Sequence, residues 1–153
     1  MKYSQEIPIA WHHIREARTL VHDALSQHDR ALREAAGMTL SELLENALKY
    51  GEAVPGMPGA SYTIVVEENY VEVQVSNGLT SEESLAELKR RIDAISAAAD
   101  KQALYIERLE EIMNNPSVGG QLGLFRIGCE GGFDLSYRFE APTLTVTARR
   151  QLP

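Results

Sequence analysis

Two short segments near the middle of the chain are rich in β-branched and aromatic residues. They cover residues 62–66 and 70–75, and the polar residues 67–69 lie between them. A connection of this length and chemistry predicts a β-hairpin. A second pair of such segments, 133–139 and 143–148, predicts another hairpin near the C-terminus. Because hairpins join antiparallel strands, the sheet is expected to contain antiparallel pairs.

Much of the N-terminal third carries apolar residues at helical spacing. The pattern over residues 14–36 predicts a first helix that ends near Gly37. A second helix is expected to begin at residues 39–42, because their sequence Thr-Leu-Ser-Glu is that of a capping box. Gly51 is expected to end this helix. Residues 53–59 hold two prolines and two glycines and predict a loop.

A third stretch of helical spacing separates the two hairpins. Residues 80–83, Thr-Ser-Glu-Glu, predict a second capping box, and apolar residues three and four apart then predict a long helix over 81–113. A break is expected near Asp100, and a short helix is expected over 122–130. Helices with one apolar stripe and a sheet with one apolar face pack as a layered α+β sandwich.

Composition limits the domain organisation and the location of the protein. A chain of 153 residues that is 44% hydrophobic predicts one domain, residues 1–153, with a continuous core. The 15 Lys and Arg against 22 Asp and Glu give a net charge of -7, which disfavours nucleic acid as a partner. A single cysteine, Cys129, suits a reducing compartment. The sequence shows no signal peptide and no membrane span, so a cytoplasmic protein is expected.

The polar face of the helix predicted from Thr39 carries groups suited to phosphate chemistry. Glu42, Glu45, Asn46 and Lys49 fall on this face, opposite the apolar side of the helix. Glu42 and Asn46 lie one turn apart, a spacing that places a general base beside an oxygen ligand for Mg²⁺. The alternative is a solvated face on which Glu42 only completes the capping box.

A glycine-rich turn is the second candidate. Residues 119–124, Gly-Gly-Gln-Leu-Gly-Leu, lead directly into the helix predicted over 122–130. Glycines let backbone amides approach an anion and a helix N-terminus adds a favourable dipole, so polyphosphate is a candidate ligand. No Gly-Lys-Ser/Thr follows, which excludes a Walker A loop, and a plain loop is the alternative. Residues 76–78, Ser-Asn-Gly, close a predicted strand and alone indicate a turn.

Taken together and in this order, these segments resemble the nucleotide-binding boxes of the GHKL ATPase superfamily. Residues 42–51 resemble its N box, with a Glu and an Asn four residues apart and a following Lys-Tyr. Residues 120–124 resemble in part its second glycine box, and residues 76–78 stand where the first is expected. The resemblance, over residues 39–147, implies a Bergerat-type two-layer α/β sandwich of the α+β class. Its mixed, mainly antiparallel sheet is covered by helices.

Within this superfamily the chain is similar to anti-sigma-factor kinases and to SiaB-type protein kinases. The resemblance implies a Mg-ATP-dependent protein Ser/Thr kinase that acts on a small antagonist-like protein in bacterial signalling, and it implies a homodimer. Glu42 is then the catalytic base and Asn46 the protein ligand of Mg²⁺. The residues implied to bind ATP are Asn46, Lys49, Tyr50, Ser76, Asn77, Gly78, Gly119, Gly120, Leu122 and Gly123.

One position departs from the pattern of the superfamily. The usual first glycine box has an Asp that accepts a hydrogen bond from the adenine amino group, whereas this chain has Ser76 and Asn77. Their side chains still accept a hydrogen bond, but without the negative charge that strengthens it. A pseudokinase or partner-binding regulatory module that has lost effective ATP binding is therefore the alternative function. No zinc site is expected, because no two of the four histidines are four residues apart.

Overall fold

The computed structural model describes residues 1–7, 13–115 and 122–153. Within these ranges, five strands form one sheet in the order β1-β2-β3-β5-β4, and each pair of neighbours is antiparallel. The strands are β1 (Lys2–Ile7), β2 (Ala60–Val66), β3 (Tyr70–Gly78), β4 (Asp134–Glu140) and β5 (Thr143–Gln151). The helices are α1 (His13–Ala24), α2 (Arg30–Tyr50), α3 (Glu82–Ala97), α4 (Lys101–Asn114) and α5 (Leu122–Cys129). None of these helices is both long and apolar enough to cross a membrane.

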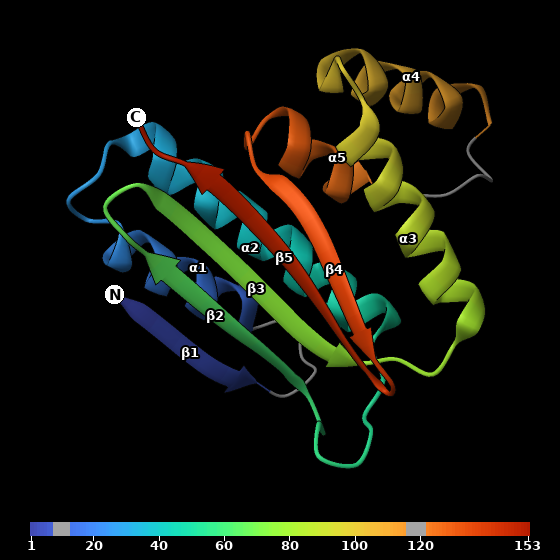
Figure 1. Ribbon diagram of the computed structural model, residues 1–153, viewed down its shortest axis with the longest axis horizontal. Helices are drawn as coiled ribbons and strands as arrows, with labels where there is room; N and C mark the ends of the chain where they lie inside the picture. The colour runs from blue at the N-terminus through green and yellow to red at the C-terminus, as the bar shows by residue number, and fades with distance from the viewer. Residues whose placement is uncertain (8–12, 116–121) are drawn as a thin grey trace.

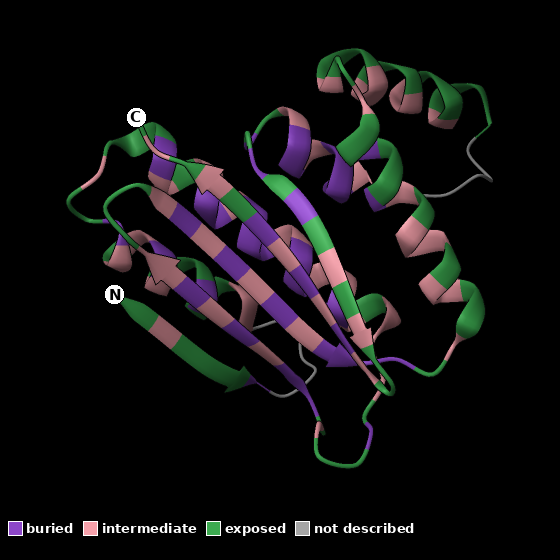
Figure 2. Cartoon of the chain, in the orientation of Figure 1, coloured by how far each residue is buried: buried purple, intermediate pink, exposed green. Residues whose placement is uncertain are grey.

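The sheet and the helices form two layers. In the view of Figure 1, α1 and α2 lie behind the sheet, and α3, α4 and α5 gather beside its β4 edge. Buried and half-buried residues alternate along β2 and β3 (Figure 2), because successive side chains of a strand point to opposite faces. One face of the sheet is therefore buried against the helices. The α+β two-layer sandwich expected from the sequence is confirmed.

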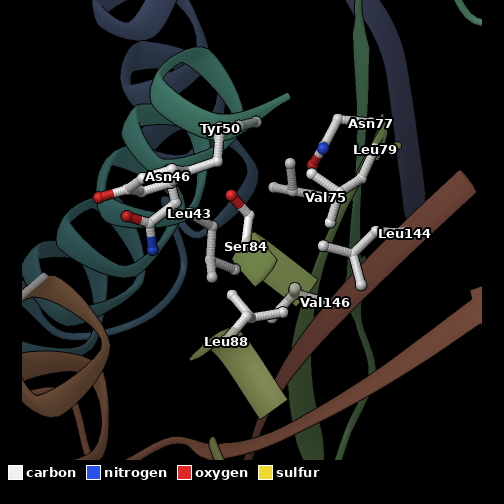
Figure 3. Close-up of a pocket in the computed structure, with 11 residues that line it drawn as sticks. Leu43, Asn46, Tyr50, Val75, Asn77, Leu79, Ser84, Leu88, Leu144 and Val146 are labelled. Atoms are coloured by element: carbon white, nitrogen blue, oxygen red, sulfur yellow. The ribbon is translucent and has the colours of Figure 1, made fainter. Parts of the chain in front are cut away.

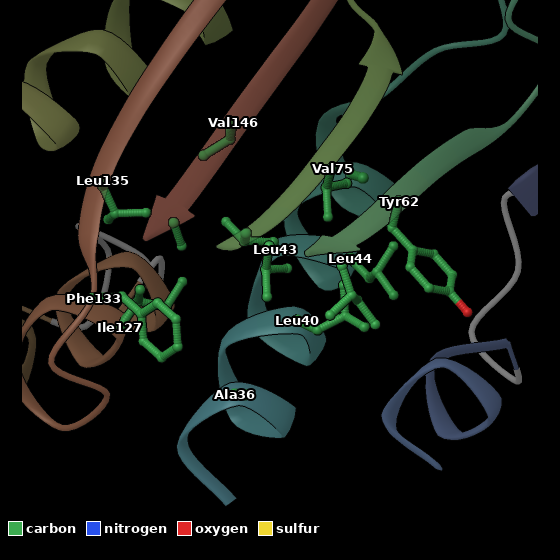
Figure 4. Packing of buried hydrophobic residues seen from close by; sticks show 14 of the residues in the cluster. Ala36, Leu40, Leu43, Leu44, Tyr62, Val75, Ile127, Phe133, Leu135 and Val146 are labelled. Atoms are coloured by element: carbon green, nitrogen blue, oxygen red, sulfur yellow. The ribbon is translucent and has the colours of Figure 1, made fainter. Parts of the chain in front are cut away.

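The centre of the core lies between α2 and the sheet. Leu40 and Leu44 on α2 are fully buried, and Figure 4 shows them beneath the strands that carry Tyr62 and Val75. Phe133, also fully buried, lies beside residues of α5 and β4 in the same cluster. Burial of these large side chains holds the apolar side of α2 against the sheet. The polar side chains of α2 therefore lie on the sides of the helix that do not contact the sheet.

The boundary between the first two helices is the main correction to the sequence analysis. The N-cap of α2 is Asp29, whose carboxylate accepts a backbone N–H at 2.8 Å. The predicted helix end near Gly37 and the predicted capping box at 39–42 are therefore wrong. Gly37 lies inside α2, where an added Cβ would come within 3.1 Å of His22 Nε2. This glycine allows α1 and α2 to pack closely, and Ser41 Oγ donates to its carbonyl oxygen at 2.9 Å.

The remaining expectations about the elements are mostly confirmed. Both hairpins form, Gly51 caps the end of α2, and Asp100 breaks the long helix by capping α4. The capping of α3 shifts by one residue, because Ser81 accepts the N-cap bond while Thr80 bonds to the Glu52 carboxylate. β1 was not predicted from the sequence. It is a mostly exposed strand that is held by backbone pairing with β2.

Candidate functional site

A small and mainly apolar cavity lies between α2, α3 and the strands β3 and β5 (Figure 3). Its volume is about 30 Å³, which is enough for a few water molecules at most. Polar side chains interrupt the apolar wall at only a few points. The lining residues are Leu43, Asn46, Ala47, Tyr50, Val75, Asn77, Leu79, Ser84, Leu88, Leu144 and Val146.

Asn46 reaches this cavity because of the helical spacing on α2. Leu43, Ala47 and Tyr50 recur at three and four residues, and Asn46 stands beside them on the same side of the helix. The Asn46 Nδ2 atom is buried and has no hydrogen-bond partner among the residues that the structure describes. Because an unpartnered buried amide costs free energy, this position favours a bound ligand or water.

The end of β3 brings a second amide to the cavity. Asn77 is 6% exposed, and its Nδ2 donates to Gly78 O at 2.9 Å. Ser76 points to the opposite face of the strand, where its hydroxyl pairs with that of Thr145 at 2.7 Å. The structure therefore places Asn77 at the cavity and Ser76 away from it. The Asn77 side chain supplies an amide that can bond to the polar edge of a ligand.

Gly78 closes β3 against the segment that follows α2. An added Cβ would lie 2.3 Å from Glu52 O and 2.6 Å from Val54 Cγ2. Glu52 N also donates to Gly78 O at 2.8 Å, so the two backbones are in direct contact. A side chain at this position would separate them. Gly78 therefore shapes the end of the strand that carries Asn77.

Glu42 faces a different element from Asn46. Arg126 Nη1 donates to Glu42 Oε1 at 2.9 Å, and Arg126 Nε lies 3.3 Å from Glu130 Oε2. Only 17% of the Glu42 side chain is exposed. An added Cβ at Gly123 would lie 2.1 Å from Glu42 Oε2, so the carboxylate rests directly on the first turn of α5. Glycine at this position makes the space that the Glu42 carboxylate fills.

The surroundings of Glu42 suit a group that accepts a proton. Burial raises the pKa of its carboxyl above the ordinary value, and repulsion from Glu45 adds to this rise. Arg126 and Lys49 lower the pKa of the same carboxyl but do not cancel the rise. A raised pKa is the direction expected of a glutamate general base. Glu42 also lines an open, polar groove of about 800 Å³ between α1, α2 and α5, wide enough for a side chain of another protein to enter.

The other predicted site residues lie in different surroundings. Tyr50 lines the cavity, and Lys49 is exposed on α2. Leu122 is half-buried at the start of α5. Gly119 and Gly120 lie outside the described residues. In the described parts of the chain, no three His, Cys, Asp or Glu residues are grouped to hold a metal ion.

Two features of this region were not predicted from the sequence. Arg126, the partner of Glu42, was not among the candidates, although it follows Gly123 by three residues on α5 and therefore shares its side of the helix. The apolar wall supplied by α3 and β5, including Leu88 and Val146, was also missed. Its residues come from distant parts of the chain, and only the fold brings them together.

Comparison with known proteins identifies the fold. No protein-family model and no curated protein sequence matches the chain. Among solved structures, a chain in the crystal structure of the SiaB–SiaC complex from Pseudomonas aeruginosa matches with a TM-score of 0.68 and 19% sequence identity. The match covers 99% of this chain and 89% of that chain. A likeness at this level of identity concerns architecture. The chain has a SiaB-like fold.

Proposed function

We propose that the protein is a SiaB-like signalling kinase that binds ATP with Mg²⁺ and phosphorylates a Ser or Thr of a small protein partner. The observation that carries the proposal is the buried, unpartnered amide of Asn46 in a mainly apolar cavity that also holds Asn77. Native proteins normally satisfy such groups, and apolar sites with a few polar groups favour flat ligands with polar edges. An adenine base has this chemistry, and the resemblance of α2 to an N box supports the same ligand.

The adenine base would occupy the cavity with its polar edge at Asn77. The phosphates would then extend along α2 toward Glu42 and the start of α5, where backbone N–H groups favour anions. The cavity of about 30 Å³ is smaller than a nucleoside, so binding requires α3 to move outward. Ser84 and Leu88 are the α3 residues in its wall. Return of α3 over the bound nucleotide would exclude water from the reaction.

The transfer step uses Glu42 and Asn46 in different roles. Glu42 accepts the proton of the partner hydroxyl, whose oxygen bonds to the γ-phosphorus while the bond to the β–γ bridging oxygen breaks and ADP leaves. Arg126 keeps the Glu42 carboxylate oriented through its 2.9 Å hydrogen bond. Asn46 would hold Mg²⁺ through its amide oxygen, and the ion would supply neutralisation of phosphate charge.

The partner is proposed to approach through the polar groove that Glu42 lines. A Ser or Thr side chain entering this groove meets the Glu42 carboxylate directly. The likeness to a chain from the SiaB–SiaC complex supports a small protein as the partner. The resemblance to anti-sigma-factor kinases further implies a homodimer. The single cysteine favours a location in the cytoplasm, and both stay predictions.

ATP should raise the melting temperature of the protein only when Mg²⁺ is present. A ligand that binds only the folded state stabilises it by about 2.7 kcal/mol at a hundredfold excess over Kd. Asn46→Ala should remove most of this Mg²⁺-dependent shift, because it deletes the proposed metal ligand. Asn69→Ala is the matched control, since it removes an exposed amide in the turn between β2 and β3. Scanning fluorimetry with and without Mg²⁺ measures the melting temperature of both variants. A full Mg²⁺-dependent shift in Asn46→Ala would show that Asn46 is not a ligand of the metal.

A partner-binding module without effective ATP binding is the second candidate function. It is favoured by the small volume of the cavity, about 30 Å³, and by the engagement of Glu42 with Arg126. The same fluorimetry separates the two functions. A kinase shows a shift with Mg-ATP, whereas a module of this kind shows none at millimolar nucleotide.

A further inference from the structure

The sheet ends at β1 in an edge that pairs with no other strand of the described ranges. In Figure 1, α3 and α5 gather at the opposite edge, where Ser96 Oγ of α3 donates to the carbonyl oxygen of Leu135 on β4 at 3.1 Å. Figure 2 shows that β1 is largely exposed, at Lys2, Ser4, Gln5 and Glu6. An edge of this kind can pair with a strand of another chain.

The pairing of β1 with β2 determines which backbone groups point outward. Val66 N donates to Met1 O at 2.7 Å, so these two residues form a hydrogen-bonded pair. In an antiparallel ladder such pairs occur at every second residue, so the odd-numbered residues of β1 direct their backbone groups toward β2. The even-numbered residues Lys2, Ser4 and Glu6 therefore direct their N–H and C=O groups to the free edge.

These three residues also carry a symmetric arrangement of charge. Lys2 and Glu6 have opposite charges, both are exposed, and Ser4 lies midway between them. Because successive side chains of a strand alternate between faces, all three lie on the same face of the sheet. Ser4 Oγ lies 3.0 Å from Thr63 Oγ1 of β2 on this face. The outward-facing part of β1 is therefore complementary to itself when it is reversed.

We propose that two copies of the chain associate through their β1 strands, which pair antiparallel about a two-fold axis at Ser4. In this register Lys2 of each copy lies opposite Glu6 of the second copy, and opposite charges across a strand pair are stabilising. The outward-facing N–H and C=O groups of the two strands also meet. A slip of one residue would set them against groups that already bond to β2, and a slip of two would separate Lys2 from Glu6.

The pairing would join the two copies in one sheet, with five strands from each copy. The axis is perpendicular to the sheet, so the helices of both copies lie on the same side. Two strands of six residues bury less surface than most stable interfaces. We therefore expect a dimer that dissociates in the micromolar range. The inference does not depend on nucleotide binding.

Sedimentation velocity from low to high micromolar concentration tests the backbone pairing. The wild type should pass from monomer to dimer in this range. Ser4→Pro should stay monomeric, because proline removes the N–H group at the axis. The bonds to β2 do not use this N–H group, so the fold should remain, as circular dichroism verifies. Ser4→Ala is the matched control, since it keeps the N–H group and loses only the hydroxyl beside Thr63, and it should dimerise as the wild type does.

Charge reversal tests the register. Lys2→Glu and Glu6→Lys should each weaken dimerisation about tenfold, because like charges then lie opposite each other and the dimer contains the contact twice. A mixture of the two variants should dimerise about as strongly as the wild type, since every such contact again joins opposite charges. Glu68→Lys makes the same change of charge in the exposed turn between β2 and β3 and is the matched control. It should dimerise as the wild type does.

The outcomes separate this proposal from the proposed function. A wild type that stays monomeric at high micromolar concentration would overturn the pairing of β1 and leave the kinase proposal standing. A dimer that persists in Ser4→Pro and in both charge reversals would place the interface elsewhere and also overturn the pairing. If Ser4→Pro does not fold, the mixture of charge variants decides. Recovery of the dimer in the mixture would support the proposed register, and no recovery would overturn it.

Discussion

Glu42→Gln should reduce phosphorylation of the protein partner by about 100-fold or more, because a glutamine side chain cannot accept the proton of the attacking hydroxyl. ATP affinity should stay near that of the wild type, since Glu42 contacts Arg126 and α5 and does not line the cavity that holds Asn77. The measurement is incorporation of labelled γ-phosphate into the partner, with ATP binding determined in parallel.

The same substitution should not lower the melting temperature at neutral pH. The pKa of Glu42 is raised by burial, so its surroundings disfavour the ionised form even with Arg126 in contact. Between the unfolded and the raised folded pKa, the folded state binds more protons than the unfolded state, and stability falls as the pH rises through this interval. The stability of the wild type relative to Glu42→Gln should therefore decline over that interval, and thermal melts at several pH values measure the difference.

Glu45→Gln is the matched control, because Glu45 lines the same polar groove and loses the same charge. Its rate of phosphorylation should remain within a few-fold of the wild type. An unchanged rate in Glu42→Gln would deny Glu42 a catalytic role. A large fall in the melting temperature of Glu42→Gln would show instead that the carboxylate serves the fold.

Gly123→Ala should reduce phosphorylation about as strongly as Glu42→Gln. The new Cβ would lie 2.1 Å from Oε2, 2.9 Å from Cδ and 3.3 Å from Cβ of Glu42, so the Glu42 side chain must leave its position. It would then lose the 2.9 Å hydrogen bond from Arg126 that orients it. Overpacking of this kind also costs about 1–3 kcal/mol of stability. The rate of partner phosphorylation and the free energy of unfolding are the two measurements.

Gly128→Ala separates the loss of stability from the loss of activity. Gly128 lies on the same helix, and its added Cβ would meet Ile95 Cγ2 at 2.8 Å, away from Glu42. This variant should lose stability yet keep the rate of transfer. The double variant Gly123→Ala with Glu42→Gln should be no slower than Glu42→Gln alone, because both changes remove the same group. A wild-type rate in Gly123→Ala would contradict the proposed position of the base.

The elements that the sequence predicted correctly have local signals. The hairpin of β2 and β3 follows from residue type and turn length, and Asp100 breaks the long helix through its own side chain. The elements that it missed depend on contacts between distant segments. β1 is polar and becomes a strand by pairing with β2, and Gly37 remains helical because α1 packs against it. Residue type alone does not distinguish a glycine that ends a helix from a glycine inside a helix that allows another helix to pack closely against it.

Some residues of the candidate site were candidates from the sequence, but their orientation was not predictable. The N-box spacing made Glu42 and Asn46 candidates, yet only the fold shows Asn46 at the cavity and Glu42 against α5. The sequence did contain the information that separates Ser76 from Asn77. Asn77 is two residues after the buried Val75 and shares its face of β3, so strand alternation places Asn77 at the cavity.

Equilibrium dialysis of the wild-type protein against labelled ATP tests most directly whether the cavity between α2 and β3 is a nucleotide site. We expect saturable binding of one ATP per chain that requires Mg²⁺ and is displaced by adenosine, because the base is held by the apolar wall and Asn77. Equal ATP concentrations on both sides of the dialysis membrane, up to millimolar nucleotide and with excess Mg²⁺, would show that this cavity does not bind ATP.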